Sequence, residues 1–267
     1  MSPADGRPRG FVIGHPRSGT QFVARLLSAG DSGAAEHERL WRLDRRCVSA
    51  PTAFYEGRLG ADAIDRLLSA YDTRAGHAPI DCNWKLTWIL PRVLHCYPQA
   101  RILHLTRDPR DNVRSCHELD YYGALAARRE LVRDPWRDFW LRWLPRVKAA
   151  GWSTMSPLER NCAFWCESHR LALEALEAHP ARLRLRIEDL GDAAVVQALF
   201  GFFALPLPDP EALRRVAVDR CNAKLDEKHA VARLRDDPWR PEYDRLVARA
   251  CGEMAARLGY GLEPRAA

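Results

Sequence analysis

A glycine-framed loop near the amino terminus has the residue types and spacing of an anion-binding turn. Gly14 and Gly19 enclose the sequence His-Pro-Arg-Ser, between an apolar run at 11–13 and a segment with apolar residues at helical spacing. A strand that turns directly into a helix aims backbone N–H groups and the positive end of the helix dipole at one point. The two glycines let the backbone turn tightly and approach a ligand. We therefore expect an anionic group such as a phosphate to bind here.

This loop differs from the Walker A loop of nucleoside triphosphate-binding proteins. Walker A has the same glycine spacing but requires Lys and then Ser or Thr, which contact the β- and γ-phosphates and Mg²⁺. Here those positions hold Thr20 and Gln21, and the cation of the loop is Arg17. The loop therefore favours an anionic ligand that binds without a metal ion. A glycine-rich turn with no ligand is the alternative.

A second candidate anion site follows the segment RILHLT at 101–106, which the pattern predicts to be a buried strand. Arg107 comes directly after this strand, at the end where ligands of open α/β sheets bind. Asp108 is an N-cap candidate and Pro109 follows it, so we place Ser115, eight positions after Arg107, on a helix. A guanidinium and a hydroxyl can grip one phosphate. An exposed, capped helix with basic residues is the alternative.

Together the two segments resemble the sulfotransferases that use 3′-phosphoadenosine 5′-phosphosulfate (PAPS). The family's 5′-phosphosulfate loop reads P-[KR]-S-G-T-T, and here the residues from Pro16 read P-R-S-G-T-Q. Arg and Ser in the family's 3′-phosphate site are eight positions apart, as Arg107 and Ser115 are here. The resemblance implies that PAPS is the donor, that 3′-phosphoadenosine 5′-phosphate (PAP) is the product and that no metal is required. It implies these donor-binding residues: Arg17, Ser18, Gly19, Thr20, Gln21, Arg107 and Ser115.

The acidic segment after the loop helix supplies candidates for a general base. Sulfuryl transfer needs an in-line donor, a stabilised leaving group and removal of the acceptor proton. Similar sulfotransferases place a Glu here, and Glu38 matches that position best by its spacing from Arg17, with Glu36 second. His37 is third, because other branches use a His base. In an extended segment, alternation would place His37 on the face opposite both carboxylates. A solvated polar turn is the alternative.

Lys85 is the candidate for stabilising the leaving group. We place it at the end of a strand that starts near Asp81. In similar enzymes a Lys in this region contacts the bridging oxygen or the sulfuryl oxygens, where a positive charge stabilises the developing negative charge. A surface lysine at a strand end is the alternative.

The order of strand and helix patterns predicts the elements that position these residues. Their alternation indicates an α/β fold, a P-loop-type parallel sheet flanked by helices with a largely helical C-terminal third. We expect one domain over 1–267, with flexible residues 1–8 and a helical insertion or cap over 120–180. Strands are expected at 11–13, 81–86, 101–106 and 182–187, and helices at 61–71, 89–96, 136–149, 157–178, 193–203, 211–218 and 243–258.

Aromatic residues gather in the predicted insertion. The helical spacing of Trp136, Trp140 and Trp143 favours an apolar helix face, and an acceptor pocket or lid is the alternative. The other aromatic residues of this group are Phe139, Trp152, Phe164 and Trp165.

The composition is that of a folded protein of 267 residues, with 47% hydrophobic and 28% charged residues. No apolar run approaches the ~18 residues of a membrane span, and the amino terminus lacks the apolar stretch of a secretory signal. The eight cysteines form no CxxC pair and no regular framework. We therefore expect a cytoplasmic protein without a membrane span. The net charge of +6 fits a nucleic-acid partner and a small polyanionic ligand equally well, but no nucleic-acid recognition motif is present.

These observations predict a sulfotransferase that moves a sulfuryl group from PAPS to a hydroxyl or amine with a Glu general base. One alternative is a P-loop kinase or other phosphotransferase, which the missing Lys and Ser/Thr argue against. The other is a protein that binds a nucleotide without catalysis, which the acidic segment argues against. Small-molecule, carbohydrate and peptide acceptors stay open, as does a homodimer, and no nucleic-acid partner is expected.

Overall fold

The computed structural model describes residues 9–30, 33–38, 49–72, 79–123, 144–218 and 239–262. The chain divides into two compact units. The sheet unit comprises Met1–Thr106 and Leu171–Ala223, and the helical unit comprises Arg107–Arg170 and Lys224–Ala267. The glycine-framed loop at 14–19, called the phosphate loop after its expected ligand, and the segment with Glu36, His37 and Glu38 belong to the sheet unit. Arg107 and Ser115 belong to the helical unit.

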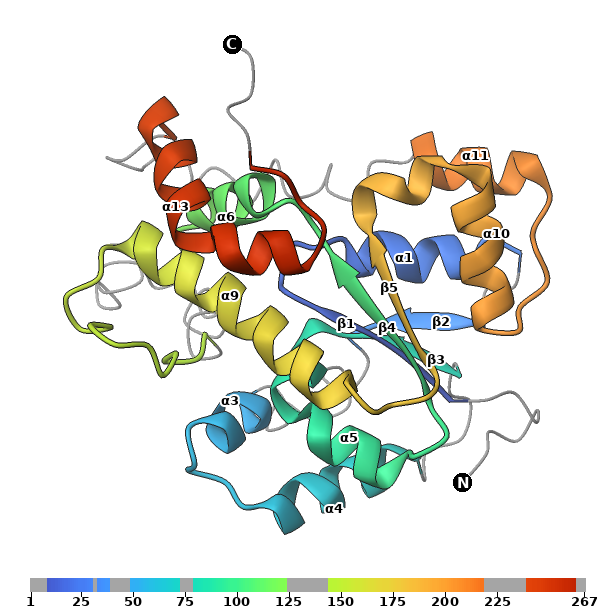
Figure 1. Ribbon diagram of the computed structural model, residues 1–267. Helices are drawn as coiled ribbons and strands as arrows, with labels where there is room; N and C mark the ends of the chain where they lie inside the picture. The colour runs from blue at the N-terminus through green and yellow to red at the C-terminus, as the bar shows by residue number, and fades with distance from the viewer. Residues whose placement is uncertain are drawn as a thin grey trace, which may run out of the picture. The chain divides into compact units, whose positions relative to one another are not determined.

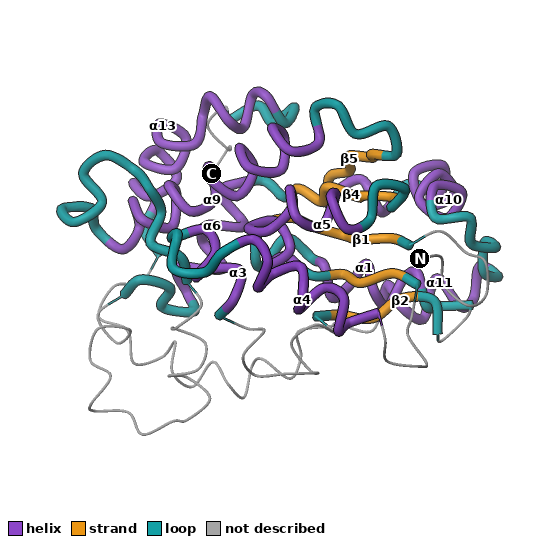
Figure 2. The backbone as a smooth tube through the Cα atoms, turned by 90° about the horizontal axis from the view of Figure 1, so that it is seen from below, coloured by secondary structure: helices purple, strands orange, loops and turns teal. Residues whose placement is uncertain are grey.

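The sheet unit contains a sheet of parallel strands in the order β2-β3-β1-β4-β5 (Figure 1). The chain leaves β1 towards β2 and leaves β4 towards β5, in the opposite direction. Strand order therefore reverses between the neighbours β1 and β4, and open α/β sheets bind ligands at the carboxyl end of such a reversal. The strands are β1 (Gly10–Gly14), β2 (Ala35–His37), β3 (Ile80–Cys82), β4 (Arg101–Thr106) and β5 (Arg182–Arg186). Figure 2, with strands in orange, follows the same order from β5 to β2.

Helices cover both faces of this sheet. Side chains alternate along β1, so Phe11 and Ile13 join one buried cluster and Val12 joins the other. On the first face lie α3 (Ala50–Tyr55), α4 (Ala61–Asp72), η2 (Trp84–Ile89) and α5 (Leu90–Cys96); on the second lie α1 (Thr20–Leu27) and α10 (Ala193–Phe202) (Figure 1). The sheet unit also holds η3 (Ile187–Gly191) and α11 (Pro210–Val218).

The helical unit contains α6 (Pro109–Glu118), α13 (Pro241–Arg257) and most of α9 (Pro157–Leu176), whose last residues belong to the sheet unit. Asp108 caps α6 as predicted, since its carboxylate accepts the backbone N–H of Arg110 at 2.8 Å. A capping box begins α9: Glu159 accepts the N–H of Ser156 at 2.8 Å, and the Ser156 hydroxyl accepts the N–H of Glu159 at 3.3 Å. Both helices therefore start where side chains satisfy their first donors.

The predicted α/β fold with a parallel sheet flanked by helices is confirmed, and the strand at 101–106 has the predicted bounds. The strand predicted at 81–86 is wrong in its second half. It ends at Cys82, because the Asn83 side chain accepts the Lys85 N–H at 3.1 Å and starts a 3₁₀ turn. Residues 144–149 are not helical, contrary to the prediction for 136–149; Pro145 cannot donate an intrahelical bond.

Several predictions from the sequence stay untested. Trp136, Phe139, Trp140, Trp143 and residues 1–8 lie outside the described residues. A single domain with a helical insertion over 120–180 stays a prediction. In the part of the chain that the structure describes, no helix has the length and apolar character needed to cross a membrane.

Candidate active site

The phosphate loop joins the end of β1 at Gly14 to the start of α1 at Thr20. Arg17 and Gly19 have φ angles of 67° and 100°, in the left-handed region that favours glycine. A Cβ on Gly14 would lie 2.4 Å from the carbonyl oxygen of Leu105 on β4, so the backbone is packed against its neighbour there. A Cβ on Gly19 would lie 2.6 Å from Cδ1 of Ile187. Packing against the backbone of β4 therefore requires glycine at position 14, and the left-handed backbone conformation favours it at position 19.

Ser18 places a buried hydroxyl group in the loop. Its side chain is fully buried, and its hydroxyl has no hydrogen-bond partner among the residues that the structure describes. A buried polar atom without a partner is costly, and such atoms in native proteins call for an explanation such as a ligand. The buried Thr20, the half-buried Arg17 and the exposed Gln21 complete the loop. This donor set at a helix N-terminus fits the 5′-phosphosulfate end of PAPS.

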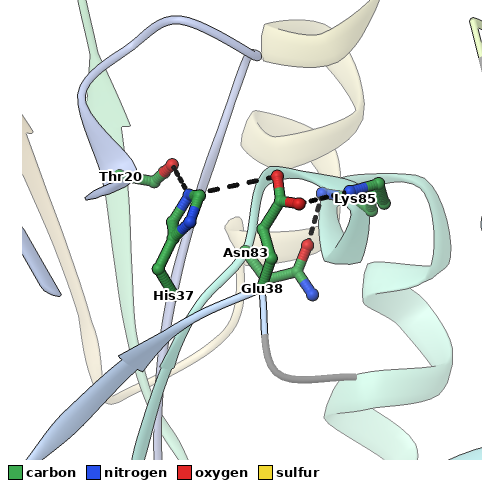
Figure 3. A network of polar contacts seen from close by, with 5 residues as sticks. All are labelled: Thr20, His37, Glu38, Asn83 and Lys85. Atoms are coloured by element: carbon green, nitrogen blue, oxygen red, sulfur yellow. Dashed lines mark hydrogen bonds and ion pairs between the residues drawn. The ribbon is translucent and has the colours of Figure 1, made fainter. Parts of the chain in front are cut away.

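A network of polar side chains connects this loop to the segment that ends β2 (Figure 3). Lys85 Nζ donates to Glu38 Oε2 at 2.8 Å. On the other side of Glu38, His37 Nε2 lies 3.9 Å from Glu38 Oε1 and 3.2 Å from the Thr20 hydroxyl. Three of the four predicted catalytic residues thus lie together, and they contact the first residue of the loop helix.

The backbone at Glu38 brings His37 and Glu38 to the same place. The N–H of Glu38 still donates to Cys82 O on β3, at 3.1 Å, but its φ of 50° takes it out of the strand. Alternation therefore stops at His37. The expectation that His37 faces away from both carboxylates is wrong for Glu38, which it approaches to 3.9 Å. Non-glycine residues with left-handed φ are strained and are concentrated at functional sites.

Glu36 lies on β2 itself, one residue before His37. Neighbouring residues of a strand point to opposite faces, so the Glu36 side chain leaves the sheet on the side away from His37. Strand alternation therefore places Glu36 and His37 on opposite faces of β2.

Glu38 is ionised in a buried setting. Burial favours the neutral carboxyl, but the charges of Lys85 and His37, with hydrogen bonds from Lys85 and Trp84, outweigh it and lower the pKa of Glu38. Burial also lowers the pKa of Lys85, and Glu38 offsets that effect only in part. Lys85 is 3% exposed, so the alternative of a surface lysine is excluded. Its ammonium also lies 4.9 Å from the centre of the Trp84 ring.

Sequence reasoning missed the residues that hold this lysine and the start of the loop. Asn83 caps η2 beside Lys85, and two residues after Lys85 the hydroxyl of Thr87 bonds to both backbone groups of Gly14. The signal was present: Thr87 is a polar residue within an otherwise apolar run, where a buried hydroxyl needs a partner.

The second anion motif lies in the helical unit. Arg107 directly follows the last residue of β4, and Ser115 lies on α6; both are half-buried. Arg110 on the same helix forms a buried ion pair with Asp108, at 2.7 Å. Arg114 pairs with Glu118 at 2.8 Å, and both of these side chains are exposed. Two of the neighbouring cations are therefore engaged by carboxylates of their own helix.

The described residues contain no group of three or more His, Cys, Asp or Glu side chains that could hold a metal ion. A buried hydroxyl in a glycine-framed turn, a helix N-terminus and a buried ion pair lie at the carboxyl end of the sheet of this α/β protein, and they make this end a candidate anion-binding site.

Solved structures share this fold over nearly the whole chain. A sulfotransferase from Alicyclobacillus acidocaldarius aligns with 17% identity and a TM-score of 0.51, covering 96% of this chain and 97% of that one. The sulfotransferase domain from the curacin biosynthetic pathway aligns with 16% identity and a TM-score of 0.56, covering 96% and 99%. The sulfotransferase domain of the Synechococcus PCC 7002 olefin synthase aligns with 16% identity and a TM-score of 0.53, covering 98% of this chain and 99% of that one.

The chain therefore has the fold of sulfotransferases, as the sequence resemblance predicted. No protein-family model matches the chain, and no curated protein matches it.

Proposed function

We propose that this protein transfers a sulfuryl group from PAPS to a hydroxyl or amine of a small-molecule, carbohydrate or peptide acceptor. The observation that carries the proposal is the buried Lys85–Glu38 ion pair, connected through His37 to the first residue of the phosphate-loop helix. It combines a cation for the leaving group with a carboxylate for the acceptor proton. The fold shared with sulfotransferases supports the same conclusion.

In this proposal the loop, with Arg17, Ser18 and the first N–H groups of α1, holds the 5′-phosphosulfate. Arg107 and Ser115 hold the 3′-phosphate, which their spacing in the sequence supports. As the acceptor oxygen or nitrogen bonds to sulfur, the bond between sulfur and the 5′-phosphate oxygen breaks. Lys85 stabilises the negative charge that develops on PAP, and Glu38 takes the acceptor proton.

The Lys85–Glu38 contact also affects how strong a base Glu38 is. The charge of Lys85 keeps Glu38 ionised and lowers its affinity for a proton. When Lys85 shares its charge with the sulfuryl oxygens, that effect weakens and Glu38 becomes the better base. We place His37 ahead of Glu36 as the alternative base, because its side chain is 25% exposed and its Nε2 lies 3.9 Å from Glu38 Oε1.

Two other functions fit this site less well. A kinase that uses MgATP needs a hydroxyl at the position of Gln21 to hold the metal, and this Gln side chain is exposed. A protein that only binds nucleotide needs no buried carboxylate, and Glu38 is costly to bury without a role for its charge.

Titration calorimetry with EDTA present tests the donor site. We expect PAP to bind without metal and 5′-AMP, which lacks the 3′-phosphate, to bind far more weakly. Equal affinity for the two ligands would refute the assignment of Arg107 and Ser115. Incubation of PAPS with a panel of acceptors, read by mass spectrometry for the gain of one SO₃ group, tests the transfer itself; binding of MgATP in place of PAP would support the kinase alternative.

A further inference from the structure

The start of the phosphate loop is fixed by a residue far away in the sequence. The hydroxyl of Thr87 donates to the carbonyl oxygen of Gly14 at 2.8 Å and accepts the N–H of Gly14 at 3.2 Å. The two residues are 73 positions apart, and the Thr87 side chain is 1% exposed. One buried hydroxyl thus satisfies both backbone groups of the last residue of β1.

Gly14 has little freedom to shift. A Cβ on Gly14 would lie 2.4 Å from the carbonyl oxygen of Leu105 and 3.0 Å from the Ser18 hydroxyl. Thr87 bonds the backbone groups of the same residue. Any movement of Gly14 therefore breaks a bond to Thr87 or changes the packing against β4, and it displaces Ser18 with the rest of the loop.

Thr87 is also close in the chain to the ion pair. Lys85 and Thr87 both lie in the 3₁₀ helix η2, whose residues from Trp84 to Ile89 are all buried. Asn83 begins this helix: its N–H donates to Val12 O of β1 at 2.8 Å, and its side chain accepts the N–H of Lys85 at 3.1 Å. The segment from Asn83 to Thr87 thus bonds to β1 at both ends: Asn83 bonds to Val12, and Thr87 bonds to Gly14. Lys85 lies between these two hydrogen-bonded residues.

We propose that Thr87 is a positioning residue, which sets the phosphate loop and Lys85 in one fixed geometry by bonding both backbone groups of Gly14. This inference rests on the proposed function for its effect on PAP binding, and on geometry alone for its effect on the loop. Thr87 acts through Gly14 and Lys85 and has no part in the proton transfer.

Two substitutions separate the hydroxyl from the size of the side chain. Thr87→Val keeps the shape and removes both hydrogen bonds, whereas Thr87→Ser keeps the hydroxyl. Tyr97→Phe is the matched control, because the Tyr97 hydroxyl makes one buried bond to a backbone carbonyl, that of Leu68, at 3.0 Å. Tyr97 contacts the opposite end of β1 through Phe11, with ring centres 5.2 Å apart.

The experiment measures hydrogen exchange of the backbone amides at 10–20 without ligand, PAP affinity by calorimetry and the melting temperature. We expect Thr87→Val to speed exchange in the loop and to weaken PAP binding about tenfold, which is within the range expected for the loss of the two hydrogen bonds to Gly14. Thr87→Ser should behave as the wild type, and Tyr97→Phe should lower the melting temperature with unchanged loop exchange and PAP affinity.

Thr87→Val with wild-type loop exchange and affinity but a lower melting temperature would overturn the proposal, since Thr87 would then be structural only. If Thr87→Val does not fold, Thr87→Ser decides, because the proposal requires it to keep slow exchange and full affinity. If the wild type does not bind PAP, the proposed function fails, and the exchange measurement alone still decides the role of Thr87.

Discussion

Lys85 Nζ lies 2.8 Å from Glu38 Oε2, and the two side chains are 4% and 6% exposed. The residues come from segments 47 positions apart, the end of β2 and the first turn of η2. Two opposite charges buried in contact depend on each other, because either one alone would lack its compensating partner.

Removal of Lys85 alone should therefore destabilise the protein. We expect Lys85→Met to lower the free energy of unfolding by about 3–5 kcal/mol, the usual cost of breaking a buried ion pair. The double variant Lys85→Met with Glu38→Gln should recover much of that loss, because no buried charge remains. Urea unfolding measures both effects. A Lys85→Met protein as stable as the wild type would show that the pair is solvated in solution.

Substitutions of the two candidate bases should separate their roles. If Glu38 is the base, Glu38→Gln lowers kcat by about 10²- to 10⁴-fold, while PAP affinity changes only a few-fold. Glu36→Gln, on the other face of the strand, should have a smaller effect and is the matched control. Steady-state transfer to an identified acceptor provides the measurement. Near-normal turnover in Glu38→Gln, with loss of turnover in His37→Gln, would assign the base to His37.

The arginines of the second motif should differ in their effect on the donor. Arg107→Ala should weaken PAP binding by about tenfold to a hundredfold, the contribution of one charge-assisted hydrogen bond. Arg110→Ala should change PAP affinity less, because its guanidinium is held by Asp108 at 2.7 Å. Calorimetric titration of both variants makes the comparison. A larger loss of affinity in Arg110→Ala would show that the motif has been read in the wrong register.

His104 should make the protein sensitive to mild acid. Burial, and then the charge of Arg184, lower its pKa to about 3 from 6.5. Between these values the unfolded chain takes up a proton that the folded protein excludes, so stability falls as the pH falls below 6.5. From about pH 7 to about pH 5 this costs on the order of 2 kcal/mol.

The measurement for His104 is the slope of unfolding free energy against pH. We expect His104→Leu to have a shallower slope over this window, and His95→Gln, at an exposed position, to keep the slope of the wild type. Glu38 does not interfere, because its pKa is lowered from 4.5 and its contribution is lost only at more acidic pH. An unchanged slope in His104→Leu would show that His104 is protonated in the folded protein.

Local patterns were sufficient for much of the fold. The segment RILHLT predicts the strand at 101–106, and Asp108 with Pro109 predicts the start of the helix after it. Such patterns depend on residues that are close in the sequence, so they can be recognised without the tertiary structure. The strand predicted at 81–86 was wrong because Asn83, a residue with a local hydrogen bond, redirects the chain into a 3₁₀ turn.

Three features can be read from the amino-acid sequence without the structure: the glycine-framed loop, its lack of the Walker A lysine and the spacing of Arg107 and Ser115. Tertiary structure decided which candidate residues meet. Lys85 contacts Glu38, and Thr87 contacts Gly14, because β3 and the turn after it lie beside β1 and β2 in the sheet. Strand order depends on how distant apolar faces pack, and nothing in a local pattern specifies that. The left-handed turn at Glu38, which brings His37 and Glu38 to one site, likewise follows from packing.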